Sequence, residues 1–89
     1  MTIVANLTSF QVASSSVMYA TLSIDYQTGG GWTSTSHQFL DVPTPTFITG
    51  LTVNSAIRNK VAAYVNTLTG GSETGLDVVL GGAFALPVL

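Results

Sequence analysis

The apolar residues change their spacing in the middle of this chain. Between residues 17 and 27 they alternate with polar residues, which is the pattern of a half-buried β-strand. The alternating apolar residues are Met18, Ala20, Leu22, Ile24 and Tyr26. From residue 53 onwards they recur every three or four positions, which is the pattern of one face of an α-helix. The residues with this spacing are Val53, Ile57, Val61, Tyr64, Val65 and Leu68. The chain is therefore predicted to form strands first and a helix afterwards.

Three strands are expected before the helix, over about residues 2–12, 17–27 and 32–42. In the first strand the apolar side switches between Leu7 and Phe10, which predicts a β-bulge or a break. The glycine run that begins at Gly29 supplies a tight connection between the second and third strands, and several loop lengths and registers stay open. In the third strand Trp32, Leu40 and Val42 share one parity and Phe39 has the other.

The linker that follows contains Pro43 and Pro45, which exclude a helix or a central strand there. The helix is expected over about residues 53–68, with Thr52 or Asn54 as its N-cap and Gly70-Gly71 at its end. A last strand is expected over about residues 76–86. Because residues 76–80 are apolar on both parities, this strand is predicted to be central in the sheet or covered by a partner.

The order β-β-β-α-β predicts a single α+β domain over residues 1–89. We expect a small, mainly antiparallel sheet with one amphipathic helix packed on one of its faces. No other segment of the sequence is available to cover the second face. This uncovered face is expected to make contacts with other molecules.

Charged side chains are scarce throughout the sequence. They make up 7% of the residues, against about 25% in an average soluble domain. The net charge is −2, and 22 of the 89 residues are Ser or Thr. Such a surface gives little protection against association, so the chain is predicted to contact copies of itself or another structural protein. The expected interface lies in the apolar C-terminal segment, at Leu76, Val78, Leu80, Phe84, Leu86, Val88 and Leu89.

Several partners and compartments are excluded by the same composition. The only cations, Arg58 and Lys60, cannot form the basic stripe that nucleic acid requires, nor attract an anionic membrane. The longest apolar stretch, Leu76–Leu89, falls short of the ~20 residues that span a bilayer. Residues 1–12 lack Lys and Arg, so we expect no secretory signal. The absence of cysteine excludes disulfides and thiolate chemistry.

No catalytic or metal-binding pattern is present. His37 has only Asp41 near it in sequence, and that residue lies ~13 Å along the same predicted strand, so His37 is expected to be a surface residue. The four acidic residues are scattered, and Glu73 with Asp77 is the one pair that could gather an ion at a loop. We therefore predict no enzyme activity, no cofactor and no metal.

The aromatic residues offer an alternative function. Tyr26 and Trp32 flank the glycine run and could lie side by side at the hairpin tip, with Tyr19 further along. Exposed rings of this kind suit a platform for a glycan or a peptide. The same rings could instead pack in the core or between subunits.

In composition and architecture the whole chain resembles the small virion structural proteins of tailed bacteriophages. The resemblance lies in the Gly-rich hairpin Asp25–Trp32, the Pro-Thr linker Val42–Thr46, and the short helix Val53–Leu68 closed by Gly70-Gly71. It includes no specific motif, so it assigns no role to any residue. It implies capsid decoration or reinforcement, or a neck or tail component, and hence a place in the virion. The alternative expected localisation is the cytoplasm.

Overall fold

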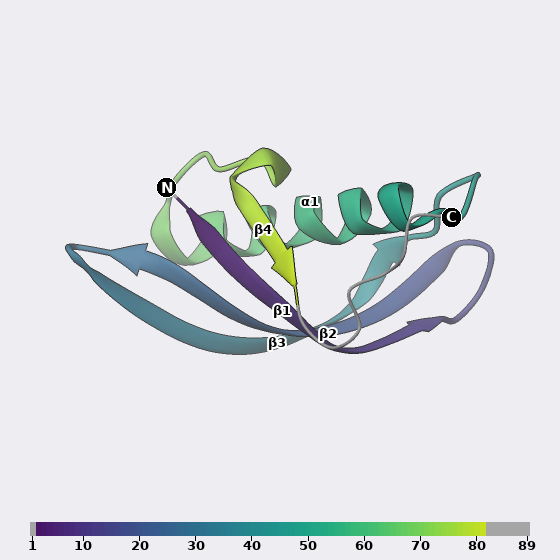
Figure 1. Ribbon diagram of the computed structural model, residues 1–89, viewed down its shortest axis with the longest axis horizontal. Coiled ribbons are helices and arrows are strands. Elements are labelled where there is room, and N and C mark those ends of the chain that lie inside the picture. The colour runs from purple at the N-terminus through teal and green to yellow at the C-terminus, as the bar shows by residue number, and fades with distance from the viewer. Residues whose placement is uncertain (1, 82–89) are drawn as a thin grey trace.

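The computed structural model describes residues 2–81 and shows a four-stranded sheet with one helix (Figure 1). The strands lie in the order β3-β2-β1-β4, and α1 lies along one face. The elements are β1 (Ile3–Val12), β2 (Val17–Thr28), β3 (Gly31–Pro43), α1 (Gly50–Thr69), a 3-10 helix (Gly75–Asp77) and β4 (Val78–Gly81). The predicted α+β fold with a helix on one face is confirmed.

A two-residue loop joins β2 to β3. Gly29 and Gly30 have φ angles of 54° and 97°, and Thr28 pairs with Gly31. Positive φ at both loop residues is the type I′ pattern, which matches the twist of the flanking strands and is costly for residues with a Cβ. Gly31 is therefore the first residue of β3, and the hairpin register is fixed by this loop.

Two bulges set which side chains face the helix. In β1, Leu7 pairs with Leu22 and Ser9 with Thr21, so an extra residue lies between them, as the switch of parity predicted. In β3, Phe39 pairs with Ala20 and Val42 with Met18, which leaves Leu40 and Asp41 opposite one residue of β2. Because of this second bulge, Val42 is buried on the same side as Phe39, while Leu40 is 56% exposed. The expectation that Val42 shares a side with Trp32 and Leu40 is wrong.

The helix begins three residues earlier than its apolar spacing suggests. Thr49, and not Thr52 or Asn54, is the N-cap. The Thr49 hydroxyl accepts a hydrogen bond from the Thr52 N–H at 3.1 Å, and the Thr52 hydroxyl accepts one from the Thr49 N–H at 2.9 Å. This reciprocal pair is a capping box, with threonine in the place usually taken by Glu or Gln. Gly70, with a φ of 72°, ends the helix as predicted.

The core lies between α1 and the facing side of the sheet. The buried helix residues are Gly50, Val53, Ile57, Val61, Ala62 and Val65. The predicted face was largely right, but Leu68 is 47% exposed and Ala62 takes a buried place instead. From the sheet, the largest fully buried side chains are Ile3, Leu7, Met18, Leu22, Ile24 and Val42.

The last strand is shorter than expected and lies at an edge. β4 pairs with β1 in parallel, Val78 beside Ile3, and it has no neighbour on its other side among residues 2–81. Leu76 belongs to the 3-10 helix that precedes it, and Val79 is 58% exposed. Of the two alternatives predicted for this strand, the central position is wrong for the described sheet, and cover by a partner stays a prediction. The part of the expected strand over residues 82–86 lies outside the described residues.

Candidate assembly surfaces

The face of the sheet opposite α1 is covered by no other element of residues 2–81 (Figure 1). We call it the open face. Side chains on it form rows across the strands: Val79, Val4, Asp25 and Ser34; then Asn6, Ser23 and Ser36; then Ser9, Thr21 and Gln38. Hydroxyls and amides dominate these rows. The one carboxylate among them, on Asp25, accepts a hydrogen bond from the Ser34 hydroxyl at 2.6 Å. The face is thus almost uncharged, as the composition predicted.

A hollow of about 300 Å³ lies on the open face near the β2–β3 loop. It is lined by Val4, Asp25, Trp32 and Ser34, and the Trp32 side chain is 56% exposed. The hollow therefore brings together one aromatic ring, one carboxylate and one hydroxyl. These groups can contact a hydroxyl-bearing ligand, but a single carboxylate offers no acid–base pair for catalysis.

The three aromatic residues expected to form a platform are not brought together. Tyr26 is only 8% exposed and belongs to the core. It alternates with more exposed residues along β2 and so lies on the helix side of the sheet, where it pairs with Thr33. Trp32 pairs with Gln27 and so projects from the other face. Tyr19 is on the open face but ~27 Å further along β2 by strand rise. A platform made of all three rings is ruled out.

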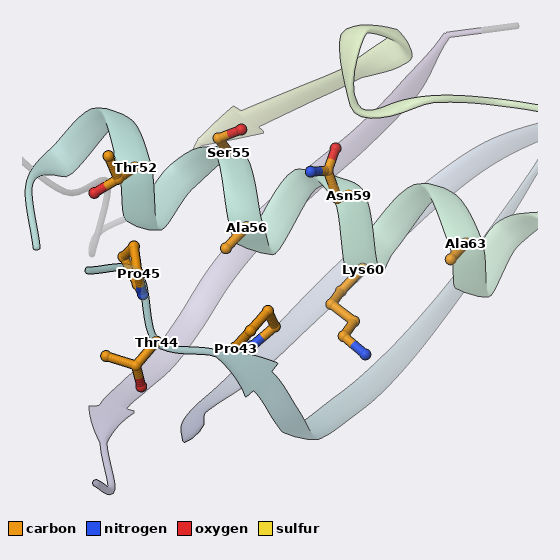
Figure 2. Close-up of a pocket in the computed structure, with 9 residues that line it drawn as sticks. All are labelled: Pro43, Thr44, Pro45, Thr52, Ser55, Ala56, Asn59, Lys60 and Ala63. Atoms are coloured by element: carbon orange, nitrogen blue, oxygen red, sulfur yellow. The ribbon is translucent and has the colours of Figure 1, made fainter. Parts of the chain in front are cut away.

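A groove of about 470 Å³ runs between α1 and the linker that follows β3 (Figure 2). Figure 2 shows Pro43 and Pro45 on the linker side, with Ala56 and Lys60 reaching in from the helix. The Lys60 ammonium forms an ion pair with Asp41 at 3.1 Å, and Asp41 is 74% exposed. This exposed pair is worth at most about 1 kcal/mol. The groove walls are mainly apolar and hold no nucleophile with a neighbouring base.

His37 lies on the helix side of the sheet and not on the free surface that the sequence suggested. Its ring stacks on Tyr64 at a centroid distance of 4.1 Å and meets Phe39 edge-on at 4.6 Å. It is half-buried because its position in β3, opposite Leu22, faces the helix. These contacts are packing contacts, and no carboxylate takes part in them.

The acidic residues do not gather into a metal site. Within residues 2–81 no group of three or more His, Cys, Asp or Glu side chains is placed to hold an ion. Asp77 instead accepts a hydrogen bond from the Thr74 N–H at 2.8 Å and caps the 3-10 helix. That backbone hydrogen bond holds the pKa of Asp77 below the usual value for aspartate.

The predicted C-terminal interface is only partly visible. Leu76 is 97% exposed and is available to a partner, whereas Val78 is 5% exposed and belongs to the core of its own chain. Leu80 is partly buried against the same core. Val78 is buried because it pairs with Ile3 on the helix side. Phe84, Leu86, Val88 and Leu89 lie outside the described residues.

Two surface features were missed by the sequence reasoning. Phe47 is 78% exposed and Leu51 is 62% exposed, just before and within the first turn of α1. Both are apolar residues that do not fit the helical spacing, and this mismatch is the sequence signal that could have identified them as exposed. The second feature is the free edge of β3, which follows from the strand order and has no signal in a single sequence. No helix within residues 2–81 is both long and apolar enough to cross a membrane.

Comparison of the chain with models of known families, with curated proteins and with solved structures finds no significant match.

Proposed function

We propose that this protein is a structural subunit that acts by assembling, through contacts with copies of itself or with another structural protein. The observation that carries the proposal is the amount of large apolar side chain left exposed on a surface with almost no charge. Leu76 is 97% exposed, Phe47 78% and Leu51 62%. Isolated exposed apolar residues are common, but they normally lie among charged groups that keep molecules apart.

The exposed apolar side chains lie in different parts of the surface. Phe47 and Leu51 lie at the start of α1, Leu76 and Val79 at the β4 edge, and Trp32 on the open face. A subunit inside a lattice or ring touches more than one neighbour and needs more than one contact surface. The distribution supports a role in an assembly better than it supports a single ligand site.

A virion is the setting that agrees with this composition and architecture. In it the protein would decorate or reinforce a capsid, or form part of a neck or tail. The support is the resemblance described above, together with an open face rich in hydroxyls and amides that can pack against a neighbouring protein without burying charge.

Light scattering of the purified chain over a hundredfold range of concentration tests the proposal. We expect a mass well above the 9.2 kDa of one chain, in a defined oligomer or polymer that persists on dilution. A 9.2 kDa monomer at every concentration, and no association with structural proteins of the same particle, would rule the proposal out.

The hollow beside Trp32 favours one alternative, a small module that binds a glycan or peptide. The exposed indole can stack on a sugar ring while Asp25 and Ser34 form hydrogen bonds to its hydroxyls. Titration with oligosaccharides, followed by Trp32 fluorescence, checks this alternative. Saturable quenching by a monomeric protein, lost in Asp25→Ala, would favour the module over the subunit.

A further inference from the structure

One edge of the sheet is long and lacks the usual protection. β3 has 13 residues and, within residues 2–81, pairs only with β2, whereas the other edge is formed largely by the four-residue β4. Residues 31–40 include no charged residue and no proline, which are the groups that normally block pairing at an edge. Protection begins only at the bulge formed by Leu40 and Asp41, and at Pro43.

The hairpin loop determines which backbone groups are free along this edge. Thr28 and Gly31 close the two-residue turn and form a hydrogen-bonded pair. Hydrogen-bonded and non-hydrogen-bonded pairs alternate along an antiparallel ladder. The odd-numbered residues from Gly31 to Phe39 therefore direct their N–H and C=O groups toward β2. Those of Trp32, Ser34, Ser36 and Gln38 point outward, away from the sheet.

This edge is complementary to itself. In an antiparallel pair of two β3 strands centred on Ser36, Ser34 of one copy lies opposite Gln38 of the other. Trp32 then lies opposite Leu40, and these two are the exposed apolar residues of β3, each 56% exposed. Trp32, Ser34, Ser36 and Gln38 have side chains on the open face. Leu40 follows the inward-facing Phe39 and is exposed at the start of the bulge, so the two Trp–Leu contacts lie at the two ends of the paired segment.

The geometry points to a dimer in which two copies pair through their β3 edges, antiparallel and about a twofold axis at Ser36. This inference rests on the proposed function and names one of its contacts. The pairing joins two four-stranded sheets into one of eight strands, with both helices on the same side. No like charges come into opposition, because Asp41 falls opposite Gly31 and already pairs with Lys60. The outward N–H and C=O groups gain partners.

Single cysteines test the register, since the chain has none of its own. Opposed residues of a hydrogen-bonded pair have Cα atoms about 5.5 Å apart, within the range that a disulfide spans. We expect Ser36→Cys to form a covalent dimer on mild oxidation or with a short thiol cross-linker. Ser34→Cys and Gln38→Cys should each fail alone, because like positions lie ~13 Å apart. An equal mixture of these two variants should cross-link.

Ser36→Pro tests the hydrogen bonds of the edge. The Ser36 N–H points away from β2, so proline there removes a donor to the partner but none to its own sheet. We expect the mass in solution to fall at least twofold, while the circular dichroism spectrum stays that of the folded wild type and the melting temperature falls only by the stabilisation that association gave. Gln11→Ala is the control, because Gln11 is exposed on the open face away from the β3 edge. It should leave the mass unchanged.

The outcomes separate this inference from the proposed function. A wild-type oligomer whose mass is unaffected by Ser36→Pro, and whose Ser36→Cys variant does not cross-link, overturns the β3 pairing and leaves assembly in place. Cross-linking of Ser34→Cys or Gln38→Cys alone overturns the stated register. A wild type that is monomeric at every concentration overturns the β3 pairing, and it overturns the proposed function as well only if it also associates with no structural protein of the same particle.

Discussion

Asn66 connects the last turn of α1 to the loop that follows it. Its amide donates a hydrogen bond to the Glu73 carbonyl at 2.9 Å and accepts one from the Glu73 N–H at 2.8 Å. One side chain thus pairs both backbone groups of a residue seven positions away, as a neighbouring strand would. This contact fixes the course of the chain between α1 and the 3-10 helix.

Replacing this amide should be costly. We expect Asn66→Ala to lower the free energy of unfolding by about 1–3 kcal/mol, because both Glu73 backbone groups lose this partner in a partly buried site. Urea denaturation measures the effect. Asn6→Ala, an exposed asparagine on the open face, is the matched control and should change stability by less than about 0.5 kcal/mol. Equal losses in the two variants would contradict this role for Asn66.

Asp77 makes stability depend on pH in the acid range. Its pKa is lowered in the folded chain, chiefly by the hydrogen bond from the Thr74 N–H. A carboxyl whose pKa is lower in the folded state stabilises the fold above its unfolded pKa of about 3.9, and this contribution is lost as pH falls through the folded value. We therefore expect the stability difference between the wild type and Asp77→Asn to be largest above about pH 4 and to shrink below it. Denaturation at a series of pH values checks this. A difference that grows on acidification would contradict it.

At the level of the elements, the start of α1 depends on a pair of threonines. Thr49→Ala removes the acceptor for the Thr52 N–H and should cost about 0.5–2 kcal/mol. Ser55→Ala is the control, since Ser55 is exposed within the same helix and alanine has the higher helix propensity. Thermal melting should therefore separate the two variants in opposite directions. A Thr49→Ala variant as stable as the wild type would show that the helix is held by its packing alone.

The elements could largely be predicted because each has a local pattern. In β2 and in the helix around Ile57, one side of the element is buried in the core. Burial requires apolar residues on that side, so the sequence shows alternation in the strand and a three-to-four spacing in the helix. The start of α1 was missed because its cap depends on the hydroxyls of Thr49 and Thr52, which carry no hydrophobic periodicity. The side taken by Val42 was missed because one bulge reverses the parity for every residue that follows it.

The candidate surfaces depend on strand order, which no local pattern encodes. Leu76–Leu80 has the apolar composition of a central strand, yet its place beside Ile3 puts it at an edge. Among the strands that the structure describes, the same order leaves β3 without a neighbour on its outer side. Tyr26 and Trp32 are neighbours in the hairpin, but the length of the turn sends them to opposite faces. Register and strand order depend on contacts between residues far apart in the sequence, and they determine which of the candidate residues reach the surface.

The molecule as a whole should associate in a way that salt does not weaken. Exposed charges are few, and the ion pair between Lys60 and Asp41 lies within one chain. Raising sodium chloride from ~0.1 M to ~1 M shortens the screening length from about 10 Å to about 3 Å. We expect the mass measured by light scattering to stay the same over this range, and to rise in ammonium sulfate, which strengthens apolar association. Dissociation in sodium chloride would show that charged contacts hold the subunits together.

The parallel pairing of β1 with β4 determines when the sheet can be completed during synthesis. Ile3 of β1 and Val78 of β4 are partners, so β1 emerges from the ribosome some 75 residues before β4. At 5–20 residues per second this is a wait of about 4–15 s. The hairpin of β2 and β3 can close early, but one side of β1 is left open until β4 is made. Short as it is, β4 is therefore the last strand of the described sheet to be added, and the Ile3–Asn6 edge of β1 gains its partner only at that point.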